Sequence, residues 1–222
     1  MQRKIPFING EFHHIYNRGV DKREIFLDRD DYERFFISMY FLNTKENDLI
    51  SKWLDFKKFN PKVQPWEFKK IKSEDKLVEL NCYCLNDNHY HFIIKQLRDR
   101  GIEIFMQKLG TSYTMYFNKK YDRSGSLLQG RFKSAYIDSD DKLLYLSAYV
   151  NKNHSIHGYK EGDNWQYSSL NEYLNKSKTF CLCNKSPIID QFRDIKEYQN
   201  YINVNALQMR ESKEMEKMAL EF

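Results

Sequence analysis

The sequence predicts an α+β fold, a ferredoxin-like βαββαβ antiparallel sheet with helices packed on it. Segments rich in Val, Ile, Tyr and Phe alternate apolar with other residues, which favours strands. Segments with apolar residues at helical spacing lie between them. Their order along the chain is strand, helix, strand, strand, helix, strand and then a further helix. The 222 residues, 41% hydrophobic and 30% charged, suit one globular domain plus an extension or insertion.

The first part of the chain predicts one strand, one helix and an insertion. Residues 12–18 are the strand, closed by a glycine. Residues 30–43 are an amphipathic helix that begins at two aspartates. Residues 44–75 are charged and carry Pro61 and Pro65, so we expect a partly helical insertion between core elements.

The rest of the chain supplies the remaining core and a tail. We expect one face of the sheet to stay open and polar. In order, the predicted elements are a hairpin at 77–97 with its turn at 86–88, a helix at 102–120, a strand at 127–137, a helix from 138 that ends before Gly158, a loop-rich cover at 159–175, and a helical tail at 188–222 whose last dozen residues are mostly charged.

Two histidines stand out in the second strand of the hairpin. Alternate side chains of a strand share a face, so His89 and His91 project together, while Tyr90, Phe92 and Ile94 point into a core. Two imidazoles on one rigid strand can bind a divalent cation. Taken alone, the His-x-His pattern is common and is more often structural than metal-binding.

A second pattern lies in the last core helix. Of the tyrosines near the later helices (Tyr113, Tyr116, Tyr145 and Tyr149), Tyr149 alone has a neutral oxygen ligand, Asn153, four residues ahead on its own helix face. A phenol that attacks phosphorus forms a covalent phosphotyrosine. His157 is a weaker ligand candidate. Spacing alone equally allows Tyr149 to fill a helix–sheet interface.

Composition bears on partners and location. The net charge of +5 is compatible with nucleic acid, and 16 Tyr, 16 Phe and 3 Trp offer faces on which unpaired bases stack, although most fill the core. Two Cys-x-Cys pairs, Cys82/Cys84 and Cys181/Cys183, could form a zinc site, but the first pair reads as buried strand residues. We expect a cytoplasmic protein without a membrane span or signal peptide.

Four segments in this order resemble the single-tyrosine HUH transposases, especially the REP-associated branch. The resemblance spans about residues 12–175. Its segments are FHHIYNRG at 12–19, NHYHF at 88–92, GSLLQGRFKS at 125–134 and AYVNKNHSIHG at 148–158.

The resemblance implies cleavage and rejoining of single-stranded DNA on a ferredoxin-like sheet, with Mg²⁺ or Mn²⁺ as cofactor. Its chemistry would yield a 5′-phosphotyrosine and a free 3′-hydroxyl without ATP. His89 and His91 would bind the metal, Asn153 would complete the site, and Tyr149 would be the nucleophile.

The resemblance also implies partners and a domain plan. Single-stranded DNA with hairpin structure would be the partner, and a homodimer is possible because relatives include dimers and monomers. Residues 1–175 would form the DNA-cleaving domain and residues 176–222 a helical extension. The residues that would contact DNA phosphates are Asn17, Arg18, Arg131 and Lys133.

The chain departs from the family pattern at two places. Asn86-Asp87 stands where relatives often have Met-Pro, and His154 replaces a Pro after Asn153. Both changes alter turn or helix-end geometry, and neither removes a catalytic group. Two alternatives stay open: a single-strand binding module without chemistry, and a metal phosphodiesterase that uses water while Tyr149 is structural.

Overall fold

The computed structural model describes residues 6–159, 165–176 and 180–219, of which 214–219 are described by their backbone alone. It confirms the predicted α+β class, because four antiparallel strands form one sheet in the order β2-β3-β1-β4. The strands are β1 (Phe12–Arg18), β2 (Val78–Asn86), β3 (His89–Gln96) and β4 (Lys133–Ile137). The α-helices are α1 (Arg29–Phe41), α2 (Leu49–Phe59), α3 (Pro65–Phe68), α4 (Gly101–Lys120), α5 (Asp140–Asn151), α6 (Asn153–Ile156), α7 (Leu170–Tyr173), α8 (Ser186–Ile189) and α9 (Ile195–Ala219), and two 3₁₀ turns are η1 (Val20–Lys22) and η2 (Ser73–Asp75).

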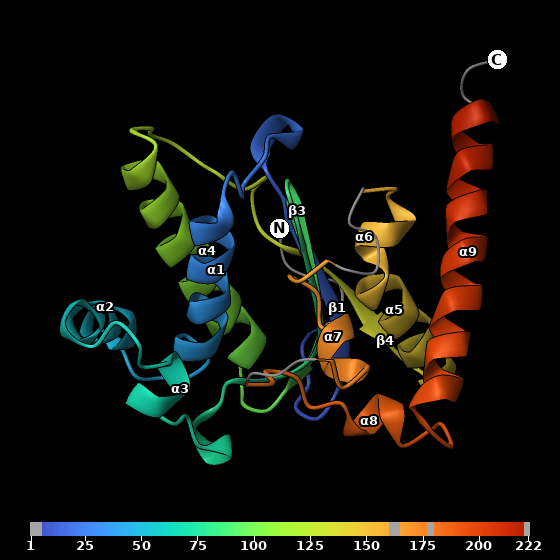
Figure 1. The fold of residues 1–222 in the computed structure, drawn as a ribbon, viewed down its shortest axis with the longest axis horizontal. Helices are drawn as coiled ribbons and strands as arrows, with labels where there is room; N and C mark the ends of the chain where they lie inside the picture. The colour runs from blue at the N-terminus through green and yellow to red at the C-terminus, as the bar shows by residue number, and fades with distance from the viewer. Residues whose placement is uncertain (1–5, 160–164, 177–179, 220–222) are drawn as a thin grey trace.

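The helices form layers on both sides of the sheet. In Figure 1 the sheet is seen nearly edge-on, with α1 and α4 on one side, α5 and α6 on the other, and α9 outermost beside α5. Tyr90, Phe92 and Ile94 lie in the core under α1 and α4, as predicted. The second face, expected to be open and polar, is covered in part. Apolar side chains of α5 and α9 bury part of it, among them Leu143, Tyr198 and Ile202.

The two central strands, β1 and β3, carry the site described below. β1 matches its predicted range, and the hairpin turns through two residues, because Asn86 pairs with His89 across β2 and β3. The outer edge of β2 is not left bare. Leu85 N–H donates to Tyr167 O at 2.9 Å and Ser169 N–H donates to Tyr83 O at 2.9 Å, so the segment before α7 runs along that edge. Residues 160–164 of the predicted cover lie outside the described residues.

The predicted strand at 127–137 is shorter in the structure, where β4 begins at Lys133. Gly130 has φ +65°, a conformation that interrupts an extended chain. Before it, Leu127 and Leu128 are buried against the helical core, and Leu128 bridges to Gly19. The segment therefore folds back along the end of β1 before β4 starts.

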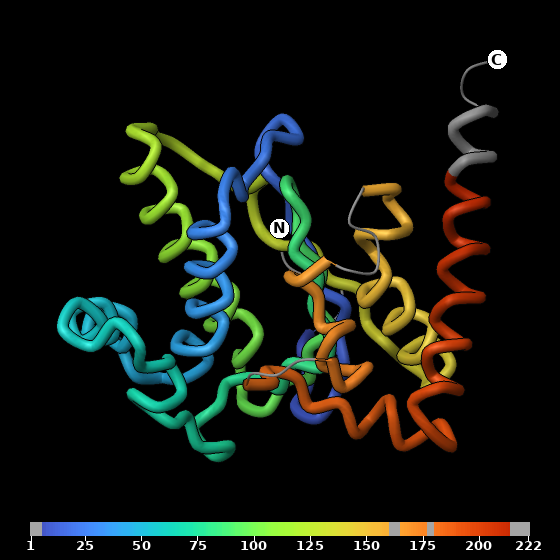
Figure 2. The backbone as a smooth tube through the Cα atoms, viewed as in Figure 1, coloured from blue at the N-terminus to red at the C-terminus, as the bar shows by residue number. Residues whose placement is uncertain are grey.

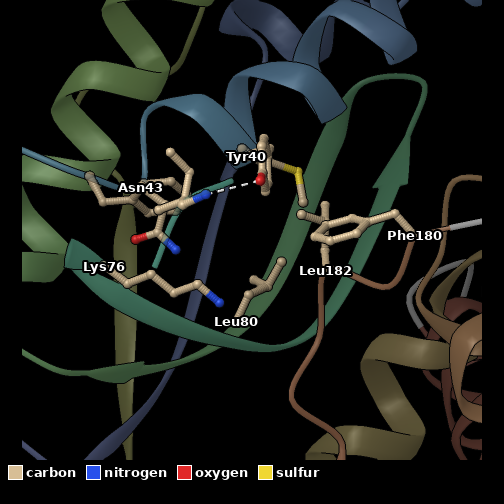
Figure 3. A pocket seen from close by; sticks show the side chains of 9 residues that line it. Tyr40, Asn43, Lys76, Leu80, Phe180 and Leu182 are labelled. Carbon is tan, nitrogen blue, oxygen red and sulfur yellow. Dashed lines mark hydrogen bonds between the residues drawn. The ribbon is translucent and has the colours of Figure 1, made fainter. Parts of the chain in front are cut away.

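The insertion is partly helical, as predicted, and its ends are tied together. Asn43 Nδ2 donates to Val78 O at 2.9 Å, and Asn43 Oδ1 accepts from Val78 N–H at 2.9 Å. This clamp joins the end of α1 to β2, so α2 and α3 can loop out and pack around Trp53 without interrupting the core. Figure 3 looks into a small cavity at this junction, where Tyr40 accepts a hydrogen bond from the Ile71 backbone beside Phe180.

The tail is helical, as predicted, although α9 ends at Ala219 and residues 220–222 lie outside the described range. It packs through Tyr198, Ile202, Ala206 and Met209, all buried. Within the described residues, none of the helices combines the length and the apolar character that a membrane span requires.

Candidate active site

The site lies between the histidine face of β3 and the helices α5 and α6. α5 begins with Ser139 as its N-cap, whose hydroxyl accepts a hydrogen bond from Lys142 N–H. Twelve residues of helix then bring Tyr149 over the sheet. Strand alternation turns His89 and His91 toward it, as predicted. His91 is 7% exposed, Asn153 is fully buried, and His89 and Tyr149 are half-buried.

Four residues named from the sequence converge within one chain. The rings of His89 and His91 lie 5.1 Å apart, centroid to centroid. His89 Nε2 lies 3.3 Å from Asn153 Oδ1, and the Tyr149 ring lies 5.3 Å from the His91 ring, edge to face. Two imidazoles, an amide oxygen and a phenol therefore surround one small region.

The predicted single helix from 138 to 158 is broken. Lys152 has φ −101° and ψ 7°, and it separates α5 from α6. Tyr149 thus sits on α5 and Asn153 on α6. The break is small, because Lys152 N–H still donates to Ala148 O and His157 N–H to Asn153 O. The one-turn spacing of the phenol and the amide survives.

The donor set fits a divalent cation. His89 Nδ1 lies 2.6 Å from Asn88 Oδ1, and His91 Nδ1 lies 2.9 Å from His14 Nε2. Such partners on Nδ1 orient a metal-binding imidazole and direct its Nε2 toward the ion, which at His89 would replace the 3.0 Å contact of Nε2 with Asn86 Nδ2. Burial lowers the pKa of His89, and lowers that of His91 well below its usual value, so both rings are neutral at pH 7.

The Asn153 amide has one buried atom that the structure leaves without a hydrogen bond. Its Oδ1 accepts from Asn86 Nδ2 at 2.8 Å, whereas Nδ2 has no partner among the described residues. A buried unpartnered donor is uncommon and often marks a functional site. Burial raises the pKa of Tyr149, and the Asn153 amide beside the hydroxyl acts the other way. This amide can therefore serve an anionic oxygen.

Acid should destabilise the fold through the imidazoles. Burial lowers the pKa of His14 to about 4, whereas a histidine in an unfolded chain titrates near pH 6.5. Below pH 6.5 the unfolded chain gains a proton that the folded chain refuses, so stability is full above 6.5 and falls between 6.5 and 4. At ~1.4 kcal/mol per pKa unit, His14 accounts for on the order of 3 kcal/mol at pH 4.

Urea unfolding at several pH values checks this expectation. The difference in free energy of unfolding between the wild type and His14→Gln should shrink as the pH falls, because the variant lacks the group that titrates. A difference that stays constant from pH 7.5 to 4.5 would contradict it.

Sequence reasoning missed two residues that hold the site. His14 lies beside His91 and also stacks on Tyr16. The alternation of β1, which puts His14 and Tyr16 on one face, was the sequence pattern that could have identified it. Asn86 is fully buried, and its Nδ2 lies 3.0 Å from His89 Nε2. Asn86 Oδ1 lies 3.1 Å from His154 Nδ1, so the two departures from the family pattern touch each other.

The weaker ligand candidates stand apart from this set. His157 is exposed, its ring lies 5.2 Å from that of His89, and its Nε2 lies 3.0 Å from Lys213 Nζ. Cys82 and Cys84 are free and buried in the apolar cluster under α5. Among the described residues, no group of three or more His, Cys, Asp or Glu side chains could hold a metal ion, so a zinc site of that kind is not found there.

The four predicted DNA-binding residues gather at the end of β1. Arg18 Nε donates to Gln129 Oε1 at 2.7 Å, and Asn17 Nδ2 donates to Gly130 O at 3.2 Å. Arg131 and Lys133 are exposed. Asn17 and Arg131 also line an open groove of about 920 Å³ between α4 and residues 126–132, which Phe7, Arg100, Gln107, Thr111 and Phe132 help to form.

Comparison with known proteins gives one family match. A sequence model of the family described as "Transposase IS200 like" matches residues 59–153. This segment contains His89, His91, Tyr149 and Asn153. No curated protein matches the chain.

Two solved structures are similar to this chain at low sequence identity. A REP-associated tyrosine transposase bound to a REP hairpin is 12% identical, with a TM-score of 0.49, and the match covers 83% of this chain and 91% of that one. A tRNA(His) guanylyltransferase from Saccharomyces cerevisiae is 9% identical, with a TM-score of 0.30, and the match covers 92% of this chain and 81% of that one. Both TM-scores are below 0.5, so the fold is assigned from the sheet topology.

Proposed function

We propose that this chain is a metal-dependent transposase that cleaves and rejoins single-stranded DNA through a phosphotyrosine, and the match of residues 59–153 to the IS200-like transposase model supports this proposal. Membership of that family would make it a DNA-cleaving enzyme. The observation that carries the finer proposal is the meeting of Tyr149 with His89, His91 and Asn153.

In the proposed reaction Tyr149 is the nucleophile. Its phenol loses a proton and its oxygen attacks the scissile phosphorus; a P–O bond to tyrosine forms and the P–O3′ bond breaks. The leaving 3′-oxygen takes up a proton, which gives a free 3′-hydroxyl and a 5′-phosphotyrosine. The new bond keeps the energy of the phosphodiester, so attack by a 3′-hydroxyl rejoins the strand without ATP.

His89, His91 and Asn153 would hold the cation, Mg²⁺ or Mn²⁺. Such a cation neutralises non-bridging oxygens and makes phosphorus a better electrophile. The surrounding residues of the chain position the ligands and the phenol. Asn88 and His14 fix the two rings through their Nδ1 atoms, and Asn153 keeps an amide N–H beside the Tyr149 hydroxyl.

We propose that Tyr149 serves the histidines of its own chain, since their rings already lie 5.3 Å apart. A homodimer then remains compatible with the proposal but is not needed to complete the site. In this proposal residues 1–175 are the DNA-cleaving domain and residues 176–222 are a helical extension, in which α9 packs against α5.

The proposed DNA path runs past the end of β1. Arg131, Lys133 and Arg18 would contact phosphates, and Asn17 would line the groove beside α4. Its aromatic and polar lining suits unpaired bases, which stack on rings and offer edges for hydrogen bonds. A hairpin next to unpaired bases is the proposed partner, because it presents both shape and free bases.

Salt should reveal which basic residues touch phosphate. For single strands, the logarithm of affinity falls with the logarithm of salt by roughly 0.7 per neutralised phosphate. Arg131→Ala and Lys133→Ala should each weaken binding and lower this slope by about 0.7. Lys196→Ala, on the exposed side of α9, is the control and should leave the slope unchanged. Fluorescence anisotropy across a salt series measures it, and a slope equal to wild type in both variants would rule out these contacts.

A covalent-capture experiment tests the function as a whole. The full chain is incubated in Mn²⁺ with labelled hairpin-tipped single strands and run on a denaturing gel. A DNA-linked protein band supports the proposal, and mass spectrometry of the peptide should identify Tyr149. Cutting without a linked species would favour the water-using phosphodiesterase, and binding without cutting would favour the binding module.

A further inference from the structure

The buried stripe of α9 ends in a lysine. Tyr198, Ile202, Ala206 and Met209 follow at spacings of four, four and three and pack on the body of the protein. Lys213 comes four residues after Met209, so helical geometry puts it on the same face. Figure 2 traces α9 alongside α5 and α6, the helices that carry Tyr149 and Asn153.

The Lys213 ammonium faces the site from the side opposite the sheet. Its Nζ lies 3.0 Å from His157 Nε2 and 5.5 Å from the centre of the Tyr149 ring. Its charge also acts on the imidazoles: burial is the largest cause of the lowered pKa of His89, His91 and His157, and Lys213 contributes to each. One cation therefore reaches both the phenol and the paired histidines.

This placement concentrates positive charge. Lys213 and a divalent cation held by the two imidazoles would both attract an anion that lies between them. Asp87 raises the pKa of His89 against these effects, and its carboxylate already accepts a hydrogen bond from the Tyr32 hydroxyl at 2.7 Å. A phosphodiester at the Tyr149 hydroxyl would bring negative charge close to the Lys213 ammonium.

We propose that Lys213 is a further catalytic residue, whose ammonium donates a hydrogen bond to a non-bridging oxygen of the scissile phosphate. This rests on the proposed function, because Tyr149 must be the attacking group. Lys213 keeps its protons throughout: the bond to tyrosine forms, the P–O3′ bond breaks, and charge that grows on the phosphate oxygens meets a fixed cation. Such preorganised donors are among the larger contributions to catalysis.

The experiment compares single-turnover capture rates. The substrate comes from a pool of hairpin-tipped oligonucleotides with randomised flanks, from which wild-type protein in Mn²⁺ recovers the strands it captures. Lys213→Ala should react about 100- to 1,000-fold more slowly, the range typical of lost oxyanion donors. Lys213→Arg should restore the rate to within about fivefold of wild type, and affinity should change little, because one contact among many is lost.

Two controls separate this role from a structural one. Lys196→Ala removes a lysine from the same helix, roughly 25 Å away at 1.5 Å per residue, and should react as wild type. Lys213→Met keeps most of the aliphatic stem and should be as slow as Lys213→Ala. A substrate with a methylphosphonate at the scissile position lacks one charged oxygen. On the isomer that lacks the oxygen bound by Lys213, Lys213→Ala should react almost as fast as the wild type.

The outcomes are distinct. Wild-type rates in Lys213→Ala, or equal rate losses on the phosphodiester and on both methylphosphonate isomers, would overturn the role of Lys213 and leave the transposase proposal intact. If wild-type protein captures nothing from the whole pool, the proposed function fails and the role of Lys213 fails with it.

Discussion

Tyr149→Phe is expected to abolish covalent capture of DNA, because the change deletes the attacking oxygen and keeps the ring. We expect the rate to fall by at least about 1,000-fold, comparable to the loss of a catalytic nucleophile in other enzymes. The ring meets His91 and His14 edge to face, at 5.3 and 5.9 Å, and phenylalanine preserves both contacts. The fold and the affinity for DNA should therefore survive.

The measurement is a time course of the DNA-linked band on denaturing gels, with affinity measured on the same strand. Tyr145→Phe is the matched control: it lies one turn earlier on α5 and is 47% exposed, so it should react as wild type. Unchanged cutting by Tyr149→Phe, with no linked protein, would show that water is the nucleophile. A linked band in that variant would move the nucleophile to another residue.

Loss of either strand histidine should also stop cleavage. His89→Ala and His91→Ala each remove a proposed ligand from a set of three, and we expect rates to fall by about 1,000-fold or more, beyond the 10- to 100-fold typical of groups that only orient a ligand. Phosphate contacts elsewhere dominate binding, so affinity should stay within a few-fold of wild type. Chelation of divalent cations should have the same effect as the substitutions, and added Mn²⁺ should reverse it for the wild type only.

His13→Gln is the control for these variants. His13 precedes His14 on β1, points to the other face of the sheet, and packs against Phe7 and Tyr136. Under conditions in which His13→Gln is as stable as the wild type, this variant should cleave at nearly the wild-type rate. Normal cleavage by either His89→Ala or His91→Ala in Mn²⁺ would mean that the ligands are assigned wrongly.

The strongest sequence signals were local. Alternation along 88–94 placed two histidines on one face, and a spacing of four placed Tyr149 beside Asn153; the structure brings all four together. The break at Lys152 was not predicted, because a lysine in a helical run carries no signal for it. The late start of β4, after Gly130, was also not predicted. In the sequence, Leu127 and Leu128 look like the beginning of the same strand.

Contacts between distant segments could not be predicted in the same way. Lys213 and His157 are 56 positions apart, and no motif connects them. His14 meets His91 only because β1 and β3 are neighbours in the sheet. The covering of the second face by α9 likewise depends on where the tail docks. Periodicity shows that a helix has an apolar stripe, but it does not show which surface receives that stripe.

The hydrogen bond between Asn86 and His154 bears on how this site can change over generations. Asn86 is fully buried and His154 is 2% exposed, so exchanging one of them for the residue common in relatives would remove that bond from the other inside the protein. Each single exchange should therefore destabilise the protein, and the double exchange should cost less stability than the two single exchanges added together. Such coupling would favour sequences in which both positions change together.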